Sequence, residues 1–133
     1  MDAKRVAIGT VVGGVTMFLV GYLIWNIVLD YWNAAFVEAG VARETQLLWV
    51  NALSNVLAAA LLTFTIERGG SSTIGAGVKI GAIVGFLVWA GVDLSFYANT
   101  TIFDLTTIIL DPLLAGVWFG IGGGVISAVL GRA

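Results

Sequence analysis

The chain contains no cysteine and no histidine, and few of its residues are charged. Without cysteine it can form no disulfide and do no thiol chemistry, and without either residue it lacks the usual ligands of zinc and haem. Charged residues make up 11 % of the 133 positions, against about 25 % in a soluble domain. We therefore expect neither a soluble globular domain nor a nucleic-acid binder, and no metal or cofactor.

Apolar sequence is what the chain has in abundance. Hydrophobic residues make up 59 % of it, and the mean hydropathy is +1.03. A membrane-spanning helix needs about 20 mainly apolar residues, and four such segments use up most of the chain. The predicted class is an all-α, multi-pass protein of the cell (plasma or inner) membrane, folded as a four-helix transmembrane bundle in a single domain. The predicted helices cover residues 6–29, 44–66, 74–98 and 112–130.

The start of the last helix depends on the single proline. Proline at the first helical position costs no hydrogen bond, and Asp111 before Pro112 is a favoured N-cap. We therefore predict that the helix begins at Pro112 and that residues 101–110 form a short segment on the membrane surface. The alternative is one longer helix that is kinked at Pro112.

The basic residues predict an orientation. Lys and Arg are enriched on the cytoplasmic side of membrane proteins, and five of the six basic residues here fall on one side of the predicted helices. We expect both termini to be cytoplasmic, and the first apolar run, which is longer than a signal-peptide core, to be retained as an anchor. The five residues are Lys4, Arg5, Arg68, Lys79 and Arg132, and Arg43 lies on the other side.

Two further patterns concern helix packing. Residues 8–13 resemble residues 80–85, which suits a duplicated helical hairpin, although chance similarity between glycine-rich helices is the alternative. Glycines also recur at four-residue spacing, which keeps them on one helix face and permits close approach of two backbones. They predict packing within the bundle or, alternatively, a homodimer face. These glycines are Gly9, Gly13, Gly77, Gly81, Gly85, Gly116, Gly120 and Gly124.

Polar residues are concentrated toward the other end of the predicted bundle. Six of the eight acidic residues lie in the outer half, and Asn55 lies near the midplane. This asymmetry suits a polar cavity that opens outward, with Asp93 as its strongest candidate because apolar residues surround it in the sequence. The alternatives are helix caps, solvated loops and hydrogen bonds between helices. The candidate ligand-binding or ion-binding residues are Asp93, Asp111, Asn51, Asn55, Asn26 and Asp30.

Aromatic residues are frequent near the same end. Most of them are predicted to form a belt at the membrane interface, whereas Trp89 and Trp118 lie deeper, where packing or lipid contact is the main expectation and a pocket wall the alternative. The predicted belt contains Trp25, Trp32, Trp49, Tyr22, Tyr31 and Tyr97.

The third and fourth predicted helices resemble a family of small prokaryotic four-helix membrane proteins of unknown function. The resemblance implies a four-helix topology and marks Asp93, Ser95 and Asp111 as its polar positions. It does not extend to the first helix, where an acidic residue is missing near Tyr22 and residues 21–25 are closer to a second uncharacterised small membrane family. The residues that carry it are Gly81, Ala82, Gly85, Trp89, Ala90, Asp93, Leu94, Ser95 and Ala98, followed by Asp111, Ala115 and Gly116.

These observations favour a protein that binds or transports a small ligand or cation in an outward-facing polar cavity. The alternative is a structural or accessory subunit whose glycine faces pack against a second copy or a larger membrane complex. An enzyme is not expected, because no serine or threonine is obviously paired with a base. The lipid bilayer is the one partner that the composition itself requires.

Overall fold

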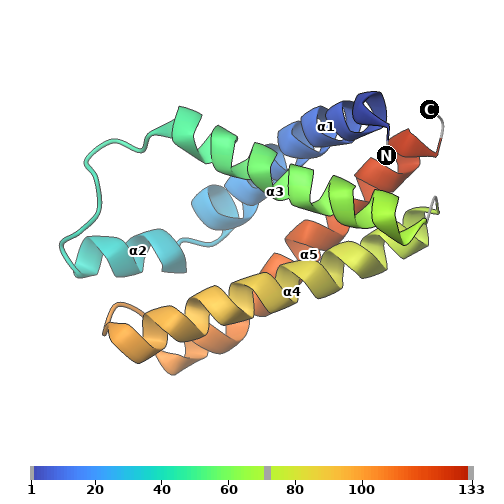
Figure 1. Cartoon of the computed structure of the whole chain (residues 1–133). Coiled ribbons are helices and arrows are strands. Elements are labelled where there is room, and N and C mark those ends of the chain that lie inside the picture. The colour runs from blue at the N-terminus through green and yellow to red at the C-terminus, as the bar shows by residue number, and fades with distance from the viewer. Residues whose placement is uncertain (1, 71–72, 132–133) are drawn as a thin grey trace.

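The computed structural model describes residues 2–70 and 73–131, and the regular structure within those ranges is entirely helical. Four helices are long and apolar enough to cross a membrane, which confirms the predicted all-α fold with four spans (Figure 1). A fifth helix, α2, has eight residues and is too short to span. The elements are α1 (Ala3–Tyr22) with its π-helical continuation η1 (Leu23–Val28), α2 (Tyr31–Glu38), α3 (Leu48–Gly69), α4 (Ile74–Asn99) and α5 (Leu105–Leu130).

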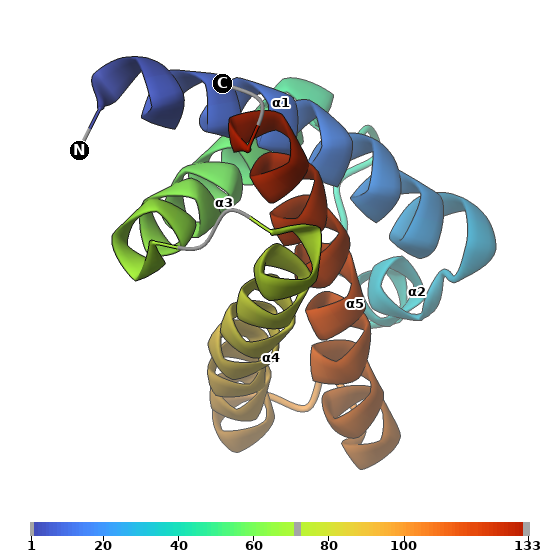
Figure 2. The same ribbon diagram turned by 90° about the vertical axis from the view of Figure 1, so that its right-hand side faces the viewer.

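The long helices run between two ends of the molecule (Figure 1). At one end, which we call the terminal end, α1 and α4 begin and α3 and α5 finish. At the opposite end, the loop end, η1 and α4 finish and α3 and α5 begin. The helix α4 packs along α5, and α1 packs against both α3 and α5 (Figure 2). Of the four long helices, α5 is the most buried. This is expected, because α5 packs against α4 and also contacts α1 and α3.

Glycine brings α4 and α5 into direct backbone contact. A Cβ atom added to Gly81 would lie 2.1 Å from the carbonyl oxygen of Phe119, and one added to Gly77 would lie 2.3 Å from that of Gly123. A side chain at Gly77 or Gly81 would therefore clash with the backbone of α5. Glycine at these positions lets the two backbones approach closely, which is how small residues allow helices to associate in lipid.

The other predicted glycines also lie at contacts between helices of the chain itself. Gly9 faces Thr63 of α3, and Gly13 faces Ile126 of α5. The row of Gly116, Gly120 and Gly124 faces α4. The buried apolar core lies mainly in the half of the molecule toward the terminal end. It consists of Met17, Ala59, Leu62, Ile66, Phe119, Ile126 and Leu130.

The prediction that the last helix begins at Pro112 was wrong, because α5 begins at Leu105 and contains Pro112. An earlier residue supplies the cap: the Asp104 carboxylate accepts a hydrogen bond of 2.8 Å from the backbone N–H of Thr107. Pro112 lacks only the N–H that would have bonded the carbonyl of Ile108. The predicted surface segment at residues 101–110 is therefore mostly the first turns of α5.

The region between the first two spans also differs from the prediction. Residues 30–43 contain α2 rather than only a polar connection, and the second span begins at Leu48 rather than at residue 44. The side chain of Gln46 donates hydrogen bonds to Asn26 and Asn33, which fixes this segment outside α3. The other helix boundaries differ from the predicted ones by three residues or fewer.

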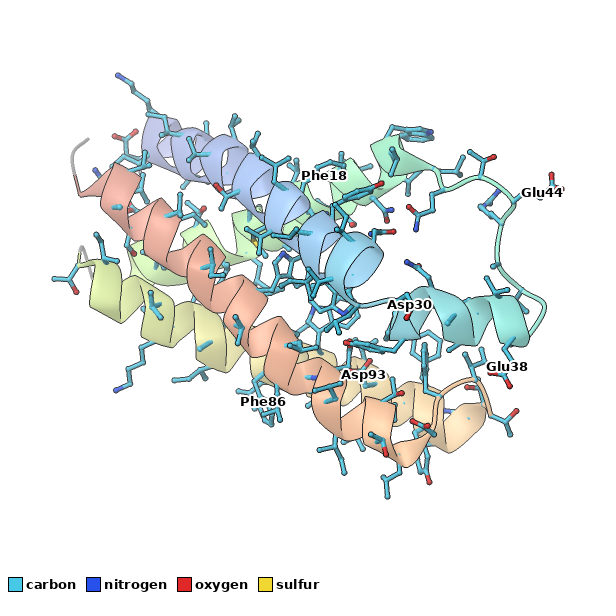
Figure 3. The ribbon with its side chains drawn as sticks, turned by 180° about the vertical axis from the view of Figure 1, so that it is seen from behind. Phe18, Asp30, Glu38, Glu44, Phe86 and Asp93 are labelled. Carbon is cyan, nitrogen blue, oxygen red and sulfur yellow. The ribbon has the colours of Figure 1, made fainter. Side chains whose placement is uncertain are left out.

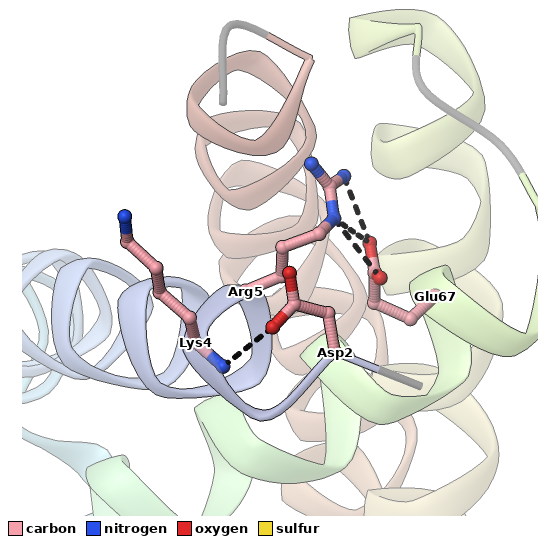
Figure 4. A network of polar contacts seen from close by, with 4 residues as sticks. All are labelled: Asp2, Lys4, Arg5 and Glu67. Carbon is pink, nitrogen blue, oxygen red and sulfur yellow. Dashed lines mark hydrogen bonds and ion pairs between the residues drawn. The ribbon is translucent and has the colours of Figure 1, made fainter.

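Polar contacts at the terminal end join α1 to α3 (Figure 4). Asp2 caps α1 by accepting a 2.9 Å hydrogen bond from the backbone N–H of Lys4. The guanidinium group of Arg5 makes a 3.1 Å ion pair with Glu67 near the end of α3. Arg132, which contributed to the predicted orientation, lies outside the described residues.

Candidate ligand-binding pocket

A cavity of about 210 Å³ lies in the half of the molecule toward the loop end. All six helical elements contribute to its wall, so residues far apart in the sequence meet there. We call this cavity the pocket. It is lined by Phe18, Gly21, Tyr22, Trp25, Asn26, Trp32, Asn33, Gln46, Asn51, Ser54, Asn55, Trp89, Asp111 and Trp118.

Asp111 is the single charged residue among the described residues that line the pocket. It lies on α5 and is 3 % exposed. Its Oδ1 atom accepts a 2.5 Å hydrogen bond from the Tyr31 hydroxyl and a 3.2 Å bond from the Trp25 indole. The same indole N–H also donates to the Tyr31 oxygen, at 2.7 Å. A carboxylate at the pocket wall is thus held in place from α2 and η1.

Tyr31 acts as a hydrogen-bond donor in this cluster. Burial raises the pKa of its hydroxyl, and the hydrogen bond to Asp111 raises this pKa further. The phenol therefore keeps its proton well into the alkaline range, where an exposed tyrosine would begin to ionise.

Asp93 is fully buried on α4 (Figure 3) and is not among the residues that line the pocket. Its carboxyl group neighbours that of Asp111. Neither of its oxygens has a hydrogen-bond partner among the described residues. Two buried carboxyl groups in contact are costly unless a proton or a cation is shared between them. The structure thus brings together the two acids that the sequence singled out, but only Asp111 reaches the pocket.

Side-chain amides occupy the side of the pocket formed by η1, α2 and α3. The Asn33 amide donates to Asn26 at 3.1 Å, and Gln46 donates to Asn26 at 3.0 Å. On α3, the Asn55 amide donates to the Asn51 carbonyl at 2.8 Å, and its own oxygen is buried without a partner among the described residues. Three predicted residues, Asn26, Asn51 and Asn55, therefore share the pocket.

Asp30 is exposed and does not line the pocket, in contrast to the prediction. The spacing of Asn26, Asp30 and Asn33 would place all three on one face of a regular helix. In the structure the wider π-helical turn of η1 and the extended backbone of Leu29 interrupt that helix. Asn26 and Asn33 still meet, because α2 folds back toward η1.

Four of the five tryptophans form a continuous aromatic wall. The Trp25 and Trp118 rings are 5.1 Å apart between centroids, Trp89 and Trp118 are 6.3 Å apart, and Trp32 and Trp89 are 6.0 Å apart. The Trp118 indole also donates a 2.8 Å hydrogen bond to the carbonyl of Met17, which fixes its ring.

Of the residues predicted to form an interfacial belt, Tyr22, Trp25 and Trp32 line the pocket and Tyr31 binds Asp111. Trp49, which is 70 % exposed, and Tyr97 lie on the outside of the molecule. A signal for the pocket was present in the spacing. Trp89 precedes Asp93 by four residues and Trp118 follows Asp111 by seven, so each tryptophan shares a helix face with an acid.

No group of three histidine, cysteine or acidic side chains in the described part of the chain could hold a metal ion. No family model matches the chain, and the searches of curated proteins and of solved structures give no match either. The family resemblance of the third and fourth spans stays a prediction.

Proposed function

We propose that the chain is a multi-pass membrane protein that binds a small positively charged ligand in the pocket, with Asp111 as the counter-ion. The observation that carries the proposal is a nearly buried carboxylate in a cavity whose described lining contains no basic side chain. Ionisable residues inside membrane helices are costly and are concentrated at functional sites.

The basic residues support an orientation for this function. Lys4, Arg5, Arg68 and Lys79 all lie at or near the terminal end of the helices, and basic residues favour the cytoplasmic side of the cell membrane. The pocket then opens toward the outside. The terminal half is filled by the buried core and by direct glycine contacts, which supports an outward-facing binding site over an open channel.

The proposal is tested by the reactivity of single cysteines, because the chain has none of its own. Ser54→Cys places a thiol in the pocket wall, and Leu57→Cys, at a position that is 63 % exposed on the outside of α3, places one toward lipid. In intact cells we expect a small cationic, membrane-impermeant thiol reagent to label the first variant and not the second. It should also react with the first variant faster than an anionic reagent of the same size.

The same rate for both reagents at Ser54→Cys would remove the electrostatic basis of the proposal. An unreactive Ser54→Cys thiol in a folded variant would show that the pocket is closed to external water and would overturn the proposal.

A further inference from the structure

We infer that the ligand is a small organic ammonium ion rather than a metal cation. The inference rests on the proposed function, because it names the chemical class of the cation that the pocket binds. Three features of the pocket carry it: the aromatic wall, the single carboxylate and the volume.

The aromatic wall suits an organic cation. Trp25, Trp32, Trp89 and Trp118 all line the pocket, and each of them is half-buried. The negative face of an indole ring attracts an ammonium group, and this attraction strengthens where water is excluded. The ring surface also contacts the carbon atoms of such a ligand, which a metal ion does not have.

The pocket has a single charged oxygen ligand for a metal ion. Calcium takes about six to eight oxygen ligands, carboxylates among them, and magnesium requires octahedral coordination. Asp111 is the one carboxylate in the described lining, and its Oδ1 atom already accepts hydrogen bonds from Tyr31 and Trp25. The amide and hydroxyl oxygens of the lining are neutral, so the site can balance one positive charge but not the two charges of calcium or magnesium.

The volume limits the size of the ligand. The pocket measures about 210 Å³, which is below the roughly 300–1,000 Å³ of drug-sized pockets. An ammonium ion with a few carbon atoms fits this limit.

The test uses the purified full-length chain in lipid nanodiscs, with tryptophan fluorescence and thermal unfolding as readouts. The probes are propylammonium and tetramethylammonium chloride, with 1-propanol as the neutral analogue and potassium and magnesium chloride at matched ionic strength. We expect saturable changes in emission and a higher Tm with the two ammonium ions, and neither change with the other three probes.

Variants locate the effect in the aromatic wall. Trp89→Leu should weaken ammonium binding by about tenfold, and Trp89→Phe, which keeps an aromatic ring, should weaken it less. Trp49→Leu is the matched control, because this tryptophan is 70 % exposed and lies outside the pocket. Its affinity should be unchanged.

Saturable binding of potassium or magnesium that displaces the ammonium ions would overturn the inference and leave the proposed function standing. Equal binding of 1-propanol would overturn both, because charge would then play no part. The absence of saturable binding by either ammonium ion would overturn the inference alone, since the labelling of Ser54→Cys decides the proposed function separately.

Discussion

Among single residues, Tyr31 joins two residues of the pocket wall, since its hydroxyl accepts from Trp25 and donates to Asp111. Tyr31→Phe removes both bonds and should lower the free energy of unfolding by about 1.5–3 kcal/mol, the range for hydrogen bonds to charged groups. Chemical unfolding in detergent measures this loss. Tyr97→Phe is the control, because Tyr97 is 46 % exposed, and a loss of the same size there would contradict the assignment.

The same hydroxyl predicts a pH dependence. The pKa of Tyr31 is raised in the folded protein by burial and by the bond to Asp111, so the unfolded chain releases this proton first as the pH rises. The stabilising contribution is complete below the unfolded pKa of about 10 and is lost progressively above it. The unfolding free energy of the native chain should fall in this range more steeply than that of Tyr31→Phe. Parallel curves would contradict the prediction.

Two glycines on opposite sides of one interface should respond differently to the same substitution. In Gly81→Ala the new Cβ meets the Phe119 carbonyl at 2.1 Å, whereas in Gly120→Ala the nearest atom is 3.5 Å away. We expect Gly81→Ala to lose about 2 kcal/mol or more. Gly120→Ala should keep or gain stability, because alanine is the better helix former by about 1 kcal/mol. Thermal unfolding of the two variants compares them, and equal stabilities would contradict the packing described for α4 and α5.

Acids and amides are expensive in lipid, so the sequence predicts a polar site at Asp111, Asn51 and Asn55, and all three line the pocket. The tryptophans could not be assigned in this way, because the sequence does not distinguish an indole at the membrane interface from an indole in a pocket wall at a similar depth. Which of the two it becomes is decided by tertiary contacts, such as the bond from Trp118 to the Met17 carbonyl.

At the scale of elements, the N-terminus of α5 depends on Asp104. Hydrogen bonding with Thr107, above all from its backbone N–H, lowers the pKa of this carboxyl, so its contribution is present at neutral pH and is lost as the pH falls through the folded value. Asp104→Ala should speed hydrogen exchange at the Thr107 amide, and Asp104→Asn, which is also a favoured cap, should not. Equal exchange in the two variants would contradict the assigned cap.

Two elements show why helix boundaries resist prediction from sequence. Asp104 and Asp111 are both suitable caps, and the choice between them depends on whether residues 105–110 can pack against the rest of the bundle. The hydrophobic pattern does not reveal the π-helical turn of η1, in which backbone hydrogen bonds shift from a four-residue to a five-residue spacing, as in the 2.8 Å bond from the N–H of Leu29 to the carbonyl of Ile24. That shift nevertheless separates Asp30 from the pocket while leaving Asn26 in it.

For the whole molecule, composition and the lengths of the apolar runs were enough to predict an all-α fold with four spans. A bilayer requires every backbone group to be satisfied within the segment, which leaves helices as the solution for long apolar runs. The pairing of α4 with α5 suits the short connection between them, but that of α1 with α3 does not follow from connection length, because α2 lies between them in the chain. The shape of the pocket does not follow from the sequence either, because it depends on how α2 packs against η1.

The orientation is a prediction for the whole molecule that single cysteines can test. Gly75→Cys lies at the terminal end with open space around it, and Glu44→Cys lies in the exposed connection at the loop end. In intact cells, an impermeant thiol reagent should label Glu44→Cys, and it should label Gly75→Cys only after the membrane is opened. The reverse pattern would place the pocket on the cytoplasmic side.

We expect one cation to bind per chain because Asp111 supplies a carboxylate in the pocket. Calorimetric titration of propylammonium into the native chain and into Asp111→Asn measures it most directly, with Asp104→Asn as the control for loss of an acid on the loop-end side. We predict one site per chain and an affinity about tenfold or more weaker in Asp111→Asn, since a hydrogen bond to a charged group contributes roughly 1.5–3 kcal/mol. The Asp104→Asn variant should bind like the native chain. Equal affinities of the native chain and Asp111→Asn would contradict the account.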